Sequence, residues 1–83
     1  MSALILFRTL LFAQRGQRLL GRFGIPGTVV KAPRGVEDRG CTYAVRLSER
    51  RRAQALEVLN KQGMEHGRVF LQLPDGSMEE VGA

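Results

Sequence analysis

Cys41, the only cysteine of the chain, is the residue whose side chain offers the most reactive chemistry. It follows Gly40 at the end of a segment, residues 32–41, that has neither helical nor alternating periodicity. The reactive form of cysteine is the thiolate, and nearby cations or a helix N-terminus lower the thiol pKa below its free value of about 8.5. Arg34 and Arg39 lie in the same segment. The segment therefore predicts an activated thiol held at the start of a strand.

The same residues also allow a purely structural interpretation. A lone cysteine in a small domain often packs as a small hydrophobic residue. Two acidic residues, Glu37 and Asp38, lie between Arg34 and Arg39 in the sequence. The two pairs of opposite charge could therefore neutralise one another in solvent. The residue types leave a reactive thiol and a buried one as open alternatives.

Two further residues could assist a thiolate. His66, the only histidine, can exchange a proton near neutral pH, although its position beside Gly67 equally fits an exposed loop. Thr9 precedes an amphipathic run, where it would act as a helix N-cap and place backbone amides nearby. The chain has no CxxC pair, no metal-ligand cluster, no Ser/His/Asp combination and no P-loop. We therefore expect no metal and no other cofactor.

Length and composition indicate one small domain, residues 1–83. A domain of this size has a small core, so a homodimer or a partner surface would add useful buried area. The apolar and charged fractions, 43% and 25%, are those of a globular protein. A single free thiol fits the reducing cytoplasm. Arg8 ends the apolar run Ala3 to Phe7 after only five residues, so we expect neither a secretory signal nor a membrane span.

The net charge of +5 raises the question of an acidic partner. Thirteen basic residues oppose eight acidic ones, yet no basic tail or long one-sided run is present. No RNA-binding aromatic motif flanks Tyr43. Nucleic acid is therefore not the expected partner, and Arg50 to Arg52 remain as an unusual basic run at the start of a helix.

Apolar periodicity predicts five strands and two helices. The central strand is Ala3 to Phe7, and a helix capped by Thr9 ends at Gly24, with Gly16 marking a close approach to the sheet. The residues expected to form the buried stripe of that helix are Phe12, Ala13, Leu19, Leu20 and Phe23. The later strands are expected at Thr28 to Lys31, Thr42 to Leu47 and Arg68 to Leu73, with an edge strand at Met78 to Val81. The second helix is expected to be capped by Ser48 and to end at Gly63. Its buried stripe is expected to be Ala55, Leu56 and Leu59.

This order, β-α-β-β-α-β with a C-terminal edge strand, predicts an α+β, ferredoxin-like fold. In it an antiparallel sheet carries both helices on one face. A right-handed crossover gives strands 3–7 and 28–31 the same direction. The cysteine segment, Thr9 and the connection 63–67 with His66 are then expected at one end of the sheet.

The residues resemble a known family of small bacterial proteins, DUF3343, described as selenium/sulfur carrier-like. The resemblance covers most of the chain, with its motifs in Ile5-Leu6-Phe7-Arg8-Thr9, Gly24-Ile25, Ala32-Pro33-Arg34, Gly40-Cys41, Tyr43 and Gly63. Thr9 and Thr42 stand where members often have Ser and a small residue.

The resemblance implies that Cys41 is the carrier thiol. It would accept sulfur or selenium as a persulfide or perselenide from a donor enzyme, such as a cysteine desulfurase, and pass it to an acceptor protein. Thr9, Arg34, Arg39, Gly40 and His66 would then stabilise or expose the anion. The protein would be a carrier and not a complete enzyme. The alternative is a small binding or regulatory module, a ligand-binding dimer or a weak RNA binder, in which the cysteine has no redox role.

Overall fold

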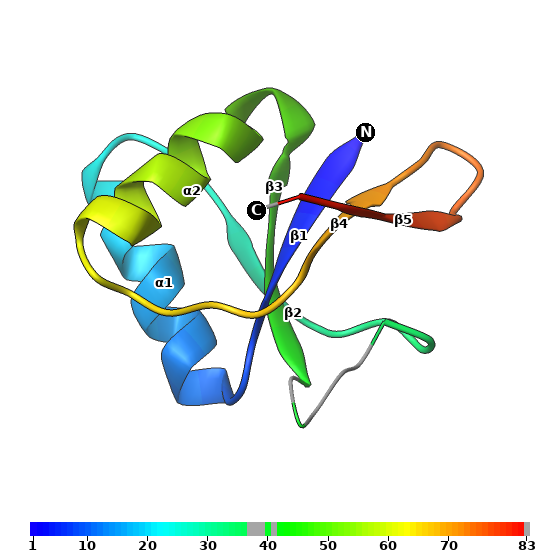
Figure 1. Cartoon of the computed structure of the whole chain (residues 1–83), viewed down its shortest axis with the longest axis horizontal. Coiled ribbons are helices and arrows are strands. Elements are labelled where there is room, and N and C mark those ends of the chain that lie inside the picture. Colours follow the sequence, from blue (N-terminus) through cyan, green and yellow to red (C-terminus); the bar gives the residue numbers. More distant parts are fainter. Residues whose placement is uncertain (37–39, 41, 83) are drawn as a thin grey trace.

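The computed structural model describes residues 1–36, 40 and 42–82 (Figure 1). Two α-helices pack against one open sheet of five antiparallel strands, in the order β2-β3-β1-β4-β5. This arrangement confirms the predicted α+β class and is compatible with the ferredoxin-like fold. The elements are β1 (Ser2–Phe7), α1 (Leu10–Arg22), β2 (Thr28–Lys31), β3 (Tyr43–Ser48), the 3-10 helix η1 (Glu49–Arg51), α2 (Arg52–Lys61), β4 (Val69–Gln72) and β5 (Met78–Val81).

The uninterrupted apolar sequence of β1 predicts a central strand covered on at least one face, and in the structure the strand is buried on both. It pairs with β3 on one side and with β4 on the other, so that Ile5 lies opposite both Val45 and Val69. Its alternate side chains enter two separate apolar clusters. The sheet is thus covered on both sides of its centre.

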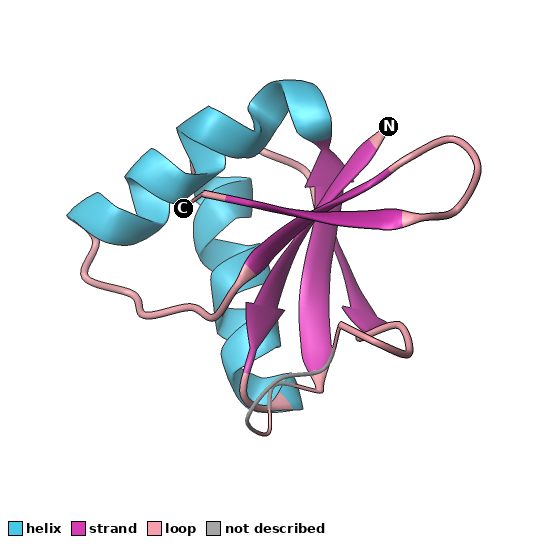
Figure 2. Cartoon of the chain, turned by 45° about the vertical axis from the view of Figure 1, so that its right-hand side comes forward, coloured by secondary structure: helices cyan, strands magenta, loops and turns pink. Residues whose placement is uncertain are grey.

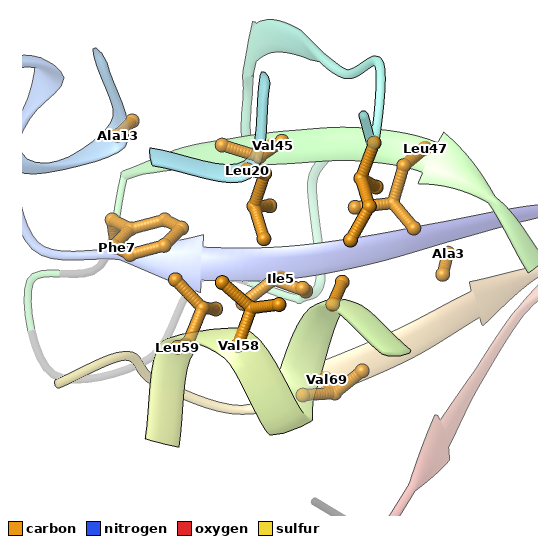
Figure 3. Close-up of a cluster of buried hydrophobic side chains, with 12 residues drawn as sticks. Ala3, Ile5, Phe7, Ala13, Leu20, Val45, Leu47, Val58, Leu59 and Val69 are labelled. Atoms are coloured by element: carbon orange, nitrogen blue, oxygen red, sulfur yellow. The ribbon is translucent and has the colours of Figure 1, made fainter. Parts of the chain in front are cut away.

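The larger cluster lies between the sheet and the two helices, which cover the same face (Figures 2 and 3). Ile5 and Phe7 project from β1 toward Leu20 of α1 and Leu59 of α2. Gly16 lets α1 approach closely, because a β-carbon placed there would lie 2.7 Å from Cζ of Phe7. The predicted close approach at Gly16 is confirmed.

The smaller cluster covers the opposite face and includes a residue from the segment between β2 and β3. Val36 is only 3% exposed and packs with Leu4, Leu6, Ala44 and Phe70. Its amide donates a hydrogen bond to the carbonyl of Pro33 at 3.3 Å, which closes a turn. The segment that sequence patterning treats as a plain loop is therefore anchored to the sheet through Val36.

The buried stripe predicted for the first helix is partly wrong. Phe12 and Phe23 are 42% and 47% exposed, because the small residues Ala13 and Gly16 form the stripe that meets the sheet and turn both phenylalanines outward. Of the stripe expected in the second helix, Ala55 and Leu59 are buried, whereas Leu56 is half-buried.

Ser48 does not cap an α-helix, contrary to expectation. It is the last residue of β3, its side chain makes no capping hydrogen bond, and η1 separates it from α2. Of the basic run, Arg50 and Arg51 therefore lie in a 3-10 turn, and only Arg52 belongs to α2, as its first residue. Nη1 of Arg51 donates to the carbonyl of Gly24 at 3.4 Å, just beyond the C-terminus of α1, where a cation is favourable. The strands also differ by one or two residues from the predicted bounds, with β3 at Tyr43–Ser48 and β4 at Val69–Gln72.

An ion pair joins Arg68, directly before β4, to Glu80 on β5. Nε and Nη2 of Arg68 donate to the two carboxylate oxygens of Glu80 at 2.8 Å and 2.5 Å. These hydrogen bonds hold the pKa of the Glu80 carboxyl below its ordinary value of 4.5. The guanidinium also lies over the ring of Phe70, 5.2 Å from its centroid. The pair therefore stabilises the hairpin only while Glu80 is ionised.

We expect Glu80→Gln to lower the free energy of unfolding at about pH 7 and to lower it less at about pH 3. A carboxyl with a lowered folded-state pKa adds stability above its ordinary pKa, and this contribution disappears as the pH falls through the folded-state value. Urea unfolding of both proteins at the two pH values measures the difference. Glu79→Gln, at the neighbouring exposed position, is the control. An equal loss for Glu80→Gln at both pH values would contradict this origin of the stability.

Candidate functional site

One end of the sheet gathers the end of β1, the start of β3, the start of α1 and the connection between α2 and β4. Phe7, the last residue of β1, lies opposite Tyr43, the first residue of β3. The connection returns to the same end, where the amide of Gly67 donates to the carbonyl of Leu6 at 2.7 Å. Thr9 and His66 therefore lie at the same end of the sheet.

Thr9 acts as the N-cap of α1. Its backbone is extended, with φ −134° and ψ 163°, and its Oγ1 accepts a hydrogen bond from the amide of Phe12 at 3.1 Å. A threonine in this role fixes the direction in which the helix leaves β1. The geometry of Thr9 is explained by capping.

The imidazole of His66 is half-buried and has a defined tautomer. Its Nδ1 lies 2.7 Å from the carbonyl oxygen of Gly67. Because a carbonyl only accepts hydrogen bonds, Nδ1 carries the proton. Nε2 makes no hydrogen bond with the residues that the structure describes.

Cys41 and Arg39, the centre of the predicted site, lie outside the described residues. Their described neighbours show how this part of the chain joins the sheet. Gly40 has φ +85°, and a β-carbon there would meet nothing within 4 Å, so backbone conformation and not space favours glycine. The carbonyl of Thr42 accepts a hydrogen bond from the amide of Ala32 at 2.9 Å, which extends the pairing of β2 with β3.

Arg34 is exposed and lies in the turn that Val36 anchors to the face opposite the helices. No hydrogen bond or ion pair joins Arg34 to the residues 1–36, 40 and 42–82. The described part of the chain therefore brings Thr9 and His66 to one end and does not show Arg34 joining them.

A cleft of about 1030 Å³ lies at this end, between α1, the connection after α2 and the end of β5. Its walls include four residues that sequence reasoning did not assign to a site, namely Arg8, Phe12, Arg15 and Met64, together with His66. The available signal was Leu10-Leu11-Phe12, because three consecutive apolar residues cannot all face the core from one helix. The guanidinium of Arg15 lies 5.9 Å from the ring centroid of Phe12.

Fold and site together define a small α+β protein whose lone cysteine occurs, in the sequence, just before β3, the strand next to the central strand β1. The chain belongs to the family described as "Putative Se/S carrier protein-like", whose model matches residues 2–70. That match includes position 41 and confirms the family resemblance found in the sequence. No curated protein and no solved structure matches the chain.

None of the helices described is both long and apolar enough to cross a membrane. Within the same residues, no group of three or more His, Cys, Asp and Glu side chains is placed to hold a metal ion.

Proposed function

We propose that the protein carries sulfur or selenium on Cys41 as a persulfide or perselenide and delivers it to an acceptor. The observation that carries the proposal is the family match over residues 2–70, which includes the only cysteine. Cysteine is the one side chain in this sequence that can hold a sulfur or selenium atom through a labile covalent bond.

The proposed uptake step is a simple exchange. The Cys41 thiolate attacks the outer sulfur of a donor persulfide, a new S–S bond forms, and the donor's own S–S bond breaks. The electron pair of the broken bond leaves with the donor as a thiolate, so no external oxidant or reductant is needed. With a donor perselenide, selenium takes the place of the outer sulfur. An acceptor thiolate then attacks the terminal atom, and Cys41 leaves as a thiolate.

The environment assigned to Cys41 in this proposal includes Arg34, Arg39 and His66 as groups that favour the anion. The support from the described residues is limited to Thr9 and His66 at the same end of the sheet, and to the glycine conformation of Gly40. The donor is proposed to be a cysteine desulfurase or an enzyme of similar output, and the acceptor a protein thiol. We propose the bacterial cytoplasm as the location, since a labile persulfide needs free thiols to turn over.

Mass spectrometry of the intact protein tests the proposal. After incubation with a cysteine desulfurase and cysteine, or with a low-molecular-weight persulfide, we expect a mass gain of one sulfur atom that a reducing thiol removes. Peptide mapping is expected to place it on Cys41, and Cys41→Ser should gain nothing. The selenium version uses selenocysteine as the substrate of the donor enzyme. A wild-type protein that gains no atom from any of these donors would refute the carrier function.

A further inference from the structure

The first turn of α1 exposes three consecutive large apolar side chains. Leu10, Leu11 and Phe12 are 43%, 58% and 42% exposed, while the helix meets the core through Ala13, Gly16 and Leu20. Single exposed apolar residues are common on protein surfaces. Three in one helical turn, with Phe12 also in the wall of the cleft, are not scattered, and such clusters mark interaction surfaces.

The same helix carries an uncompensated positive charge. Between Arg8 and Arg22 the chain has four arginines and no acidic residue. The ion pairs found among the described residues, Arg52 with Glu49 and Arg68 with Glu80, involve none of these four. Exposed apolar residues with arginine around them are the composition found at the centre of protein interfaces.

The cleft described above lies next to the first turn of α1 and extends from it toward the connection between α2 and β4. Arg8, Phe12 and Arg15 form one wall, and Met64 and His66 belong to the opposite wall. Of the two glutamates in the lining, Glu80 is already bound by Arg68, which leaves Glu65 against Arg8 and Arg15. We define the docking face as the exposed first turn of α1 together with this cleft. The docking face combines exposed apolar side chains with an excess of positive charge.

The docking face adjoins the end of the sheet at which β3 begins. Phe7 lines the cleft and is also the residue paired with Tyr43 at the start of β3. In Figure 1 the starts of α1 and β3 both lie at the lower end of the molecule. If Cys41 carries sulfur, the donor sulfur must come into contact with the Cys41 thiolate, so the donor has to bind near this end.

We propose that the docking face binds an acidic surface with an apolar centre on the protein that hands sulfur to Cys41. The inference rests on the proposed carrier function. Charge complementarity identifies the occupant as acidic, and the aliphatic side chains of Leu10 and Leu11 identify it as a protein surface. Nucleic-acid bases would stack on aromatic side chains, and of the three exposed apolar residues only Phe12 is aromatic. Opposite charges around the apolar centre speed the encounter and set the orientation.

A comparison of two double variants on the same helix tests the proposal. Phe12→Ser with Arg15→Glu alters the docking face, and Phe23→Ser with Arg22→Glu makes the same chemical changes at the other end of α1. Both phenylalanines are about equally exposed. Each protein is mixed with a persulfide-charged cysteine desulfurase, and the rate of sulfur appearance on Cys41 is followed by mass spectrometry. The same proteins are also loaded with a low-molecular-weight persulfide.

We expect the docking-face variant to accept sulfur from the enzyme about tenfold or more slowly than wild type. The matched variant at the far end should retain the wild-type rate, and all three should load equally from the small persulfide. Added salt should slow transfer from the enzyme to wild type. Leu11→Ser, at the most exposed of the three positions, repeats the test with the smallest risk to folding, which thermal unfolding monitors.

Equal enzyme-dependent rates in wild type and in the docking-face variant would overturn the inference. A parallel loss with the small persulfide would also overturn it, since the face would then bind the small compound itself. A wild type that loads from neither donor refutes the carrier function instead, so the two failures are distinguishable. A docking-face variant that is monomeric where wild type is dimeric would show that a second copy of the chain occupies the face, and would likewise overturn the inference.

Discussion

Replacing Gly16 with alanine is expected to destabilise the protein by about 1–2 kcal/mol, even though alanine is the better helix former. The new β-carbon would lie 2.7 Å from Cζ of Phe7 and 3.1 Å from Cε2. Phe7 is 1% exposed and surrounded by the core, so its ring cannot retreat without displacing its neighbours. Overpacking of this kind costs about 1–3 kcal/mol, and the gain in helix propensity offsets only about 0.5–1 kcal/mol of it.

Gly21→Ala is the matched control in the same helix. A β-carbon at Gly21 meets nothing within 4 Å, so only the gain in helix propensity remains, and we expect a small stabilisation. For a domain of this size, each kcal/mol shifts the melting temperature by roughly 4–8 °C, which calorimetry or circular dichroism resolves easily. Two alanine variants that shift the melting temperature in the same direction would contradict the close contact between Gly16 and Phe7.

Replacing Val36 with aspartate is expected to release the turn at 33–36 from the sheet. The valine side chain is buried among Leu4, Leu6 and Phe70, where an ionised carboxylate would have no partner. Because burial of a valine contributes about 1.5–3 kcal/mol, the turn should leave the sheet at about that cost instead of burying the charge. Trypsin cleavage after Arg34 measures the release, and we expect the cleavage rate to rise by roughly 10-fold to 150-fold, since each 1.4 kcal/mol is about a factor of ten.

Two controls accompany this measurement. Val36→Ala keeps the position apolar and should raise the cleavage rate less than Val36→Asp does. Thr42→Asp places the same charge at an exposed position beyond the segment and should leave the rate close to that of wild type. If Val36→Asp is cleaved no faster than wild type, the anchoring of the turn by Val36 is refuted.

The architecture could be predicted because each main element carries its own pattern. The apolar run Ala3 to Phe7 predicts a central strand covered on at least one face, and the turn at Pro74 to Ser77 predicts the hairpin that follows β4. In the structure Gly76 has φ +88° and the amide of Ser77 donates to Asp75 at 2.9 Å. These features are local, so the sequence was enough to predict them.

The missed features at Phe12 and Val36 have a common physical source, since both depend on contacts between elements distant in the chain. The orientation of Phe12 depends on how closely Gly16 lets α1 approach Phe7. The anchoring of Val36 depends on the space that Leu4, Leu6 and Phe70 leave on the face without helices. Thr9 was correctly expected to cap α1, because capping is local. The roles assigned to Cys41, Arg34, Arg39, Gly40 and His66 remain predictions.

The two edge strands of the sheet, β2 and β5, affect the tendency of the protein to associate through its sheet edges in concentrated solution. β2 has only four residues and lies between Pro26 and Pro33, and β5 carries the adjacent carboxylates of Glu79 and Glu80. Edge strands that are short, bounded by proline or charged disfavour backbone hydrogen bonding with a strand of a neighbouring molecule. Edge strands of this kind disfavour fibril growth at high protein concentration. Contacts with other proteins are then expected to be made by side chains and not by backbone pairing.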